Sequence, residues 1–321
     1  MKIDDIIDNT KHYIRNLIES KYFRINIEPY LDTENPETIP FMYHGGTFGK
    51  KREDISIIEI KERKKSQSTP PIYHNVLNKF SEERFNVPIR NFFFTSTSRE
   101  TAEAYGSPYV IIPLDDYSLF YHEDIEDMYA DINFNNSVIK NKVKNNLEDV
   151  ISKKADKLLE KVDRLIGENK KDFLRSKFYE IISNTSNYGK LEIFSKIVRE
   201  DYETLDQWGD KIKSQNIVMS FRELIIDILY GTYGMDSIID SDNYDEIVEL
   251  CWFLALEVLS GIYKITDNHI NGLAEKYISG VKKTDNISDV PGDNEIMLTP
   301  GKCLLVKDID LLFQLIKKEL E

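Results

Sequence analysis

Two kinds of sequence pattern alternate along the chain, and their order constrains the fold more than any other feature. Segments typical of β-strands lie towards both ends. The middle, from about Asn136 to Lys283, instead carries apolar residues three or four positions apart, as amphipathic helices do. We infer one α+β domain with a large all-helical insertion, whose last strands return to the first sheet. Two independent domains are the alternative, but they leave a two-stranded tail with nowhere to bury its apolar face.

The individual elements follow from local patterns. Short runs rich in Phe, Tyr, Ile and Val predict strands; they are FMYHGG (41–46), SIIEI (56–60), RNFFFTSTS (90–98), PYVIIPL (108–114), EIML (295–298) and KCLLV (302–306). Helical spacing predicts helices at residues 2–20, 73–85 and 99–106 and at the carboxyl terminus. Ser98 is the expected N-cap of the helix at 99–106, and Glu100 lies in its first turn, where the helix dipole favours an anion.

These patterns divide the chain into three parts. Residues 1–28 form an amino-terminal helix, residues 29–135 and 285–321 form a split α+β domain, and residues 136–284 form the helical insertion. Residues 29–40 contain three prolines among acidic residues, which indicates a loop at the start of the split domain. The strongly apolar stretch Cys251–Ile262 is expected to be the buried core helix of the insertion.

Charge and cysteine content exclude several classes of protein. The 321 residues include 42 basic and 56 acidic ones, a net charge of −14, which disfavours non-specific binding of nucleic acid. Cys251 and Cys303 are too few for a disulfide framework or for a zinc site with Cys₂His₂ spacing, so we expect a reducing compartment and no metal. No apolar run suggests a signal peptide or a membrane span, so the expected location is cytoplasmic, without a membrane partner.

Three short motifs have residue types that suit chemistry. Tyr43-His44-Gly45-Gly46 ends an apolar run, and its glycines would let a ligand approach the backbone; a strand that ends in a glycine turn with a surface histidine is the alternative. The second motif, from Phe94 to Tyr105, brings four hydroxyl residues to the end of a strand, although a buried strand followed by a capped helix also explains it. The third, Asp293 to Leu298, sets Glu295 at the start of a strand, where a carboxylate is usually solvated.

The order of these motifs resembles the ADP-ribosyltransferase superfamily, and most closely its His-Tyr-Glu branch, which includes diphtheria toxin and the poly(ADP-ribose) polymerases. In that branch a first strand ends in His-Gly, a second motif runs from an aromatic residue to a tyrosine, and a late strand carries Asn-Glu. Here the second motif spans twelve residues, Phe94 to Tyr105. The stretch is also similar to uncharacterised bacteriophage proteins with an F-x-T…A-x-x-Y-G-x-x-Y…P pattern. The resemblance covers residues 38–135 and 285–308 and implies a split β-sandwich core.

The resemblance also implies an activity and a role for each residue. The substrate would be NAD, whose nicotinamide–ribose bond is cleaved before ADP-ribose passes to a protein or nucleic-acid acceptor. His44 would hydrogen-bond the ribose, the Gly45 backbone would hold the carboxamide, and Tyr105 would stack on the nicotinamide ring. Glu295 would stabilise positive charge at the anomeric carbon, where a fixed carboxylate acts mainly in the transition state.

The middle motif departs from the branch. The position of its middle tyrosine is Phe94, which keeps a stacking face but lacks the hydroxyl, and Thr95 and Ser96 begin a run that resembles the Ser-Thr-Ser motif of the sister Arg-Ser-Glu branch. The resemblance therefore implies a mixed triad of His44, Glu295 and either Ser96 or Phe94, with Thr95 as a further contact to NAD. A catalytically silent, transferase-like interaction protein, such as a virion or anti-defence component of a phage, is the alternative to a transferase or an NAD glycohydrolase.

A basic strip favours a dinucleotide ligand. Residues 50–65 hold seven basic against four acidic residues in an otherwise acidic chain, and Arg52 and Arg63 in this strip are candidates to hold the pyrophosphate of NAD. A solvated loop or a strand edge protected by lysines is the alternative. Arg90, just before the strand of phenylalanines, is a further candidate for a phosphate contact or a structural role.

The remaining polar groups favour structural roles. His74 and His122 are expected to be packing or surface residues, and the acidic run from Glu123 to Asp131 is expected to be a solvated helix face rather than a cation site. RNA 2′-phosphotransfer on the same fold is disfavoured by the acidity of the chain. The insertion is expected to recruit substrate, to cover the site or to mediate oligomerisation.

Overall fold

The computed structural model describes residues 3–31, 39–46, 54–63, 71–127, 160–161, 164–165, 205–212, 214–239 and 242–321. The chain divides into two compact units, which we call the sheet unit and the helical unit. The sheet unit comprises Met1–Thr69, Leu77–Asp131 and Ala274–Glu321, and the helical unit comprises Pro70–Val76 and Ile132–Leu273. The protein is thus a mixed α+β chain, as the sequence predicts, and the helical unit interrupts the sheet unit in the sequence.

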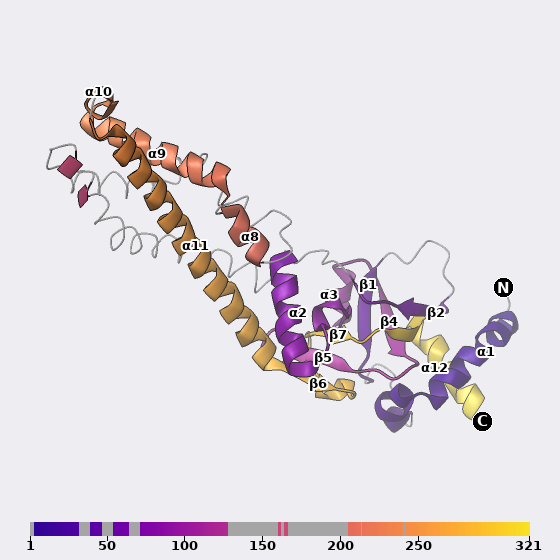
Figure 1. Cartoon of the computed structure of the whole chain (residues 1–321). Helices are drawn as coiled ribbons and strands as arrows, with labels where there is room; N and C mark the ends of the chain where they lie inside the picture. Colours follow the sequence, from indigo (N-terminus) through magenta and orange to yellow (C-terminus); the bar gives the residue numbers. More distant parts are fainter. Residues whose placement is uncertain are drawn as a thin grey trace. The chain divides into compact units, whose positions relative to one another are not determined.

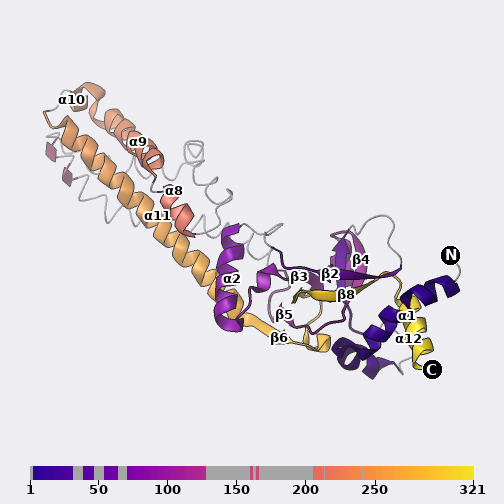
Figure 2. The same cartoon turned by 45° about the vertical axis from the view of Figure 1, so that its right-hand side comes forward.

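An eight-stranded antiparallel sheet organises the sheet unit (Figures 1 and 2). Its strands are hydrogen-bonded in the order β2-β8-β4-β1-β3-β7-β5-β6. The strands are β1 (Met42–Gly46), β2 (Ile55–Ile60), β3 (Phe93–Ser96), β4 (Ser107–Pro113), β5 (Leu119–His122), β6 (Val281–Thr284), β7 (Glu295–Leu298) and β8 (Gly301–Val306). The two strands of the carboxy-terminal tail pair with strands of the first half: β7 with β3 and β5, and β8 with β2 and β4. The prediction that the last strands return to the first sheet is therefore confirmed.

Helices from both ends of the chain cover one face of this sheet. Helices α1 (Ile3–Glu19) and α12 (Ile309–Leu320) lie side by side in both views (Figures 1 and 2), and Arg15 of α1 pairs with Glu319 of α12. Leu17 and Ile316 are completely buried in one apolar cluster with residues of the sheet. Residues 1–28, which the sequence set apart as an amino-terminal helix, thus contribute to the core of the sheet unit.

Short helical turns and two further helices complete the sheet unit. They are the π-helix η1 (Phe23–Ile27), the 3₁₀ turns η2 (Glu28–Tyr30), η4 (Ile89–Asn91) and η7 (Ile287–Asp289), and the helices α2 (Pro71–Phe85) and α3 (Arg99–Glu103). The first six residues of α2 belong to the helical unit. The Ser98 side chain accepts a hydrogen bond from the Thr101 amide at 3.2 Å, so the predicted N-cap of α3 is confirmed.

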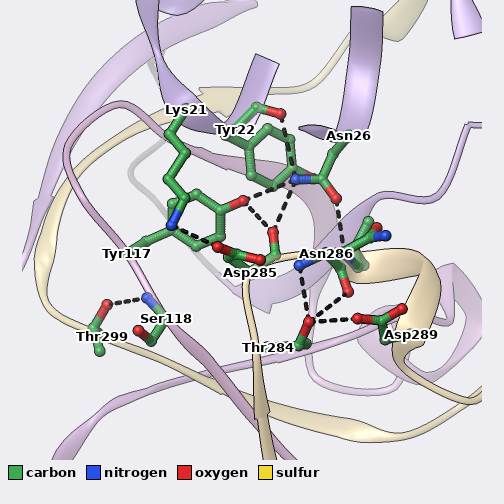
Figure 3. Close-up of polar contacts among 11 residues, drawn as sticks. Lys21, Tyr22, Asn26, Tyr117, Ser118, Thr284, Asp285, Asn286, Asp289 and Thr299 are labelled. Carbon is green, nitrogen blue, oxygen red and sulfur yellow. Dashed lines mark hydrogen bonds and ion pairs between the residues drawn. The ribbon is translucent and has the colours of Figure 1, made fainter. Parts of the chain in front are cut away.

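A buried polar network joins η1 to the segment that follows β6 (Figure 3). The Asn26 amide nitrogen donates to the Tyr117 hydroxyl at 2.8 Å and to the Asp285 carbonyl at 3.2 Å. The Asn26 side-chain oxygen accepts from the Ile287 amide at 2.8 Å. Because Asn26 is completely buried, these bonds replace the water that its amide group loses on folding. The network therefore fixes the amino-terminal segment to the second half of the sheet unit.

Within the helical unit the described elements are helices. They are α8 (Leu205–Ile212), α9 (Gln215–Tyr233), α10 (Met235–Ile239) and the first thirty residues of α11 (Tyr244–Gly280). Helix α9 runs alongside α11 in both views (Figures 1 and 2). Cys251, Leu254 and Leu259 of α11 are buried, as expected of a core helix, whereas Phe253 on the same helix is half exposed. The predicted helices between residues 136 and 204 lie outside the described residues, apart from two short helical pieces at 160–161 and 164–165.

The structure differs from the sequence prediction at the end of the helical block and in the first loop. Residues 281–284, which the sequence placed in the insertion, form strand β6 of the sheet, and the compact units separate at 131/132 and 273/274 rather than at 135/136 and 284/285. In the segment predicted as a loop, Glu28–Tyr30 is a 3₁₀ turn. None of the described helices is both long enough and apolar enough to cross a membrane.

Candidate functional site

The three motifs lie on neighbouring strands of the sheet. Ser96 of β3 is opposite Tyr43 of β1 on one side and opposite Glu295 of β7 on the other. Since adjacent strands are about 4.8 Å apart, the backbones of the first and third motifs are separated by roughly 10 Å. Segments from residues 42–46, 93–96 and 295–298 thus meet at one level of the sheet, where the sequence predicted a site.

His44 is held by the strand that carries the second motif. Its Nδ1 lies 2.8 Å from the carbonyl oxygen of Phe94, and its ring centroid lies 4.3 Å from that of Phe93. A carbonyl oxygen only accepts, so Nδ1 carries the proton and Nε2 of the neutral ring is the acceptor. Burial lowers the pKa of His44 from its ordinary value, and the nearby Arg63 lowers it further, against the opposing effect of the Phe94 carbonyl. His44 is therefore a neutral, oriented imidazole at pH 7.

Gly45 is required by the packing of β1 against α3. A Cβ at this position would lie 1.7 Å from the carbonyl oxygen of Ala102 and 3.1 Å from the Cβ of Tyr105. The sequence suggested that this glycine lets a ligand approach, whereas here α3 itself makes the close approach. Gly45 consequently fixes the position of α3, and with it Tyr105, relative to His44.

Glu295 is the first residue of β7, and its carboxylate is paired. Its Oε1 lies 2.7 Å from Nη1 of Arg90, and the side chains are 21% and 4% exposed respectively. The Glu295 amide donates to the carbonyl of Glu126 at 2.9 Å. Burial raises the pKa of Glu295, and the Arg90 guanidinium opposes this shift. No described group hydrogen-bonds Oε2, so this partly exposed carboxylate keeps one oxygen for a ligand.

Arg90 is positioned by several contacts, although its buried Nε has no hydrogen-bond partner among the described residues. Its backbone amide donates to Oδ1 of Asn78 at 2.9 Å, and its guanidinium lies 4.3 Å from the centroid of the Phe94 ring. The guanidinium also donates to the hydroxyl oxygen of Tyr277. The sequence left Arg90 open between a phosphate contact and a structural role. In the structure, Arg90 is the cation that holds Glu295.

Arg63 interacts with several of the candidate residues. Its guanidinium lies 4.2 Å from the centroid of the same Phe94 ring, and its Nε donates to the Phe92 carbonyl at 3.2 Å. Arg63 interacts electrostatically with both His44 and Glu295. Its buried Nη2 has no hydrogen-bond partner among the described residues. Burial and the charge of Arg90 lower the pKa of Arg63 to about 10.

The remaining residues of the second motif have distinct environments. Phe94 offers its ring to both Arg63 and Arg90. Ser96 is buried, and its hydroxyl accepts from the Ser98 amide at 3.0 Å, which shapes the turn into α3. Thr95 is buried as well, with its hydroxyl 3.5 Å from the Ile296 carbonyl. Tyr105, just after α3, is 68% exposed, which suits a stacking surface better than a core position.

Most other residues of the basic strip lie outside the described residues. Arg52 lies outside the described residues, as do Lys50, Lys51, Lys64 and Lys65. Lys61 is largely exposed and lies 3.7 Å from Glu59. Of the two arginines predicted to hold pyrophosphate, the structure therefore places Arg63 beside the other candidate residues and leaves Arg52 without a position.

The other polar candidates have structural explanations. His74 and His122 are both buried, and the His122 ring stacks on Tyr277 with centroids 5.0 Å apart. The expectation of a solvated helix face is wrong for residues 123–127, which follow β5 without helical structure; the rest of that acidic run lies outside the described residues. Within the described ranges, no group of three or more His, Cys, Asp or Glu side chains is placed to hold a metal ion.

Comparisons with family models, curated proteins and solved structures found no match to this chain. The site therefore rests on its own geometry. Sequence reasoning missed Tyr277, because it lies in the helical pattern at the end of the insertion and has no motif around it. It also missed the pairing of Arg90 with Glu295. An arginine just before a run of three phenylalanines was a usable signal, since an arginine buried in such a setting needs an anionic partner.

Proposed function

We propose that the chain is an NAD-dependent ADP-ribosyltransferase, which cleaves the nicotinamide–ribose bond and transfers ADP-ribose to a protein or nucleic-acid acceptor or to water. The observation that carries the proposal is the register of β1, β3 and β7, in which Ser96 is opposite both Tyr43 and Glu295. Three motifs from distant parts of the sequence are thereby adjacent. The electrostatic influence of Arg63 on both His44 and Glu295 is consistent with a single site.

The chemistry assigns a task to each group. The C1′–N bond breaks with its electron pair leaving on the nicotinamide nitrogen, and positive charge develops on the ribose. Oε2 of Glu295 would face this charge, and a fixed carboxylate in a partly buried site stabilises it more than water does. Nε2 of His44 would accept from a ribose hydroxyl and orient the sugar. Water or an acceptor nucleophile then attacks C1′ and loses its proton.

Two further residues would bind the ends of the dinucleotide. The exposed ring of Tyr105 would stack on the nicotinamide, which is a flat aromatic leaving group. The Nη2 group of Arg63 would bind a phosphate oxygen, because an anion there would supply its missing hydrogen-bond partner and offset its repulsion by Arg90. Arg52 remains part of this proposal on its sequence position alone.

We also propose that the sheet unit has the split β-sandwich fold that the resemblance implies. A split β-sandwich requires the sheet to open near the site. In support of this, the pairing of β1 with β3 consists of Tyr43 and Ser96, against five residue pairs between β1 and β4. Such an opening beside His44 would admit a ligand between the two halves of the sheet.

A catalytically silent interaction protein is the second candidate, and the Arg90–Glu295 ion pair favours it. A carboxylate that already has a cation at 2.7 Å stabilises a developing charge less than an unpaired one. Phe94, where the His-Tyr-Glu branch has its middle tyrosine, also lacks a hydroxyl for catalysis. Under this alternative, the site would bind NAD or another anion without cleaving it.

The experiment is to incubate the full chain with NAD labelled in its adenosine part, together with a cell lysate as a source of acceptors. Labelled protein or nucleic acid indicates transfer, free labelled ADP-ribose indicates hydrolysis, and unchanged NAD indicates the silent alternative. A parallel titration of NAD followed by calorimetry separates a chain that binds without turnover from one that does not bind.

A further inference from the structure

The candidate carboxylate is held by one oxygen only. Nη1 of Arg90 contacts Oε1 of Glu295 at 2.7 Å, and no described group hydrogen-bonds Oε2. An arginine that faces a carboxylate without restraint commonly binds both oxygens in a fork. The single contact therefore indicates that Arg90 is restrained by its other partners, which keep its guanidinium on one side of the carboxylate.

Apart from the sulfur of Met297 on β7, which lies 3.9 Å from Nη1, those partners come from three separate parts of the sheet unit. Asn78 of α2 accepts from the Arg90 amide, and the Asn78 amide nitrogen donates to Oδ1 of Asn91 at 2.8 Å. Phe94 of β3 packs on the guanidinium. Tyr277, in the last turns of α11, accepts from the guanidinium through its hydroxyl oxygen.

Tyr277 is itself fixed by the sheet. It is buried, its ring stacks on His122 of β5, and the neighbouring Gly280 packs so closely that a Cβ there would lie 2.2 Å from Nε2 of His122. The Glu123 amide donates to the Gly280 carbonyl at 3.4 Å. The end of α11 is thereby locked to β5 and presents the Tyr277 hydroxyl to Arg90 at a defined place.

We propose that Arg90 and Tyr277 are positioning residues for Glu295: Tyr277 orients Arg90, and Arg90 holds Oε1 of Glu295 so that Oε2 faces the ribose of NAD. This deepens the proposed function and rests on it. Under this proposal the Arg90–Glu295 ion pair orients the carboxylate and does not abolish catalysis. The helix that closes the insertion thus supplies part of the support for the carboxylate.

The groups around the Glu295 carboxylate also shift its pKa. The charged and titratable groups that interact with Glu295 are Arg90 and Arg63, which favour its ionised form, Asp127, which disfavours it, and the Tyr277 hydroxyl. Loss of the orientation of Arg90 would weaken the largest favourable interaction, so the pKa of Glu295 would rise. This shift can be measured whether or not the chain turns over NAD.

The test compares Tyr277→Phe and Arg90→Lys with the wild-type full chain. The phenylalanine keeps the ring that stacks on His122 and removes only the hydroxyl, while the lysine keeps the charge and loses the planar donor group. Tyr263→Phe is the matched control, since Tyr263 lies on the same helix α11 but bonds Asp206 within the helical unit. Far-ultraviolet circular dichroism and a thermal melt check folding, and rates are expressed per folded molecule.

Two readouts are needed. In the kinetic readout, we expect Tyr277→Phe to lower kcat for nicotinamide release about tenfold with little change in KM, as for an interaction that acts in the transition state. In the spectroscopic readout, the ¹³C signal of the Glu295 carboxyl, assigned with Glu295→Gln, should titrate at higher pH in Tyr277→Phe and Arg90→Lys than in the wild type. Tyr263→Phe should match the wild type in both.

The outcomes separate the two proposals. A wild type that releases nicotinamide, together with a Tyr277→Phe variant that has an unchanged kcat and an unchanged Glu295 pKa, would overturn the positioning role and leave the proposed function intact. A wild type that releases no nicotinamide would count against the proposed function, and the carboxyl titration would then decide alone whether Tyr277 controls Arg90 and Glu295. A rise of KM without a fall of kcat would also contradict positioning, because it indicates lost ground-state binding.

Discussion

Arg90 and Glu295 are 205 residues apart in the chain, and their side chains meet at 2.7 Å. The helical insertion lies between them in the sequence, so this contact exists only when both parts of the split sheet unit have folded together. The candidate carboxylate therefore depends on long-range assembly, while His44, Arg63 and Phe94 come from the first hundred residues.

Replacement of Gly45 by alanine should destabilise the sheet unit by about 1–3 kcal/mol, because the added Cβ would overlap the Ala102 carbonyl and push α3 away from β1. Gly292→Ala is the matched control, since its added carbon would meet no described atom within 4 Å. Urea unfolding of the two variants measures the difference. Equal stability of both would show that α3 does not pack on Gly45.

Replacement of Asn26 by alanine should cost about 1–3 kcal/mol, because it leaves the buried amide of Ile287 without a hydrogen-bond partner, while the Asp285 carbonyl keeps the Tyr117 hydroxyl. Asn16→Ala, at a more exposed position on α1, should change the free energy of unfolding by less than about 0.5 kcal/mol. Chemical denaturation followed by fluorescence measures both. A neutral Asn26→Ala would mean that the network in Figure 3 does not anchor the amino-terminal segment.

Replacement of Arg63 by glutamine should weaken NAD binding about tenfold, or ~1.4 kcal/mol, because it removes the cation that would pair with a phosphate. Lys61→Gln, two residues away with its side chain 77% exposed, should bind NAD like the wild type. Calorimetric titration gives both dissociation constants. If the two variants bind equally well, Arg63 is not the phosphate contact.

The pKa of His44 should lie below 6.5, because burial and Arg63 disfavour its charged form. A histidine with a lowered pKa stabilises the folded state fully above pH 6.5, and this contribution is lost as pH falls through the lowered value. His44→Gln should therefore show a flatter loss of stability on acidification than the wild type. An NMR titration of the His44 ring measures the pKa directly, and a value of 6.5 or higher would be inconsistent with a neutral, oriented imidazole.

The sequence predicted β1 to β4, β7 and β8, because their apolar runs are bounded by Gly, Pro and hydroxyl residues, but it did not predict β5 (Leu119–His122). It failed at β6, whose Lys282 and Lys283 read as the charged end of a helical block. These lysines are exposed on the edge strand of the sheet, where charge prevents further strand pairing.

For the candidate site, the sequence supplied the motifs but not their supports. His44, Ser96 and Glu295 were predicted from the order of three short motifs along the chain, because each motif alone also fits a purely structural role. The roles of Arg90 and Tyr277 depend on register and helix length, which no local pattern determines. At Gly45 the pattern suggested contact with a ligand, whereas in the structure α3 packs against this glycine.

The most direct test of the central claim is the rate of nicotinamide release from NAD by the full chain, compared with Glu295→Gln. Glu59→Gln is the control, because that carboxylate is 65% exposed on β2. The proposed chemistry predicts measurable release by the wild type and the control and a loss of about 10²–10³-fold in kcat for Glu295→Gln, as for removal of one transition-state contact. Release at equal rates by all three proteins, or none by the wild type although NAD binds, would contradict it.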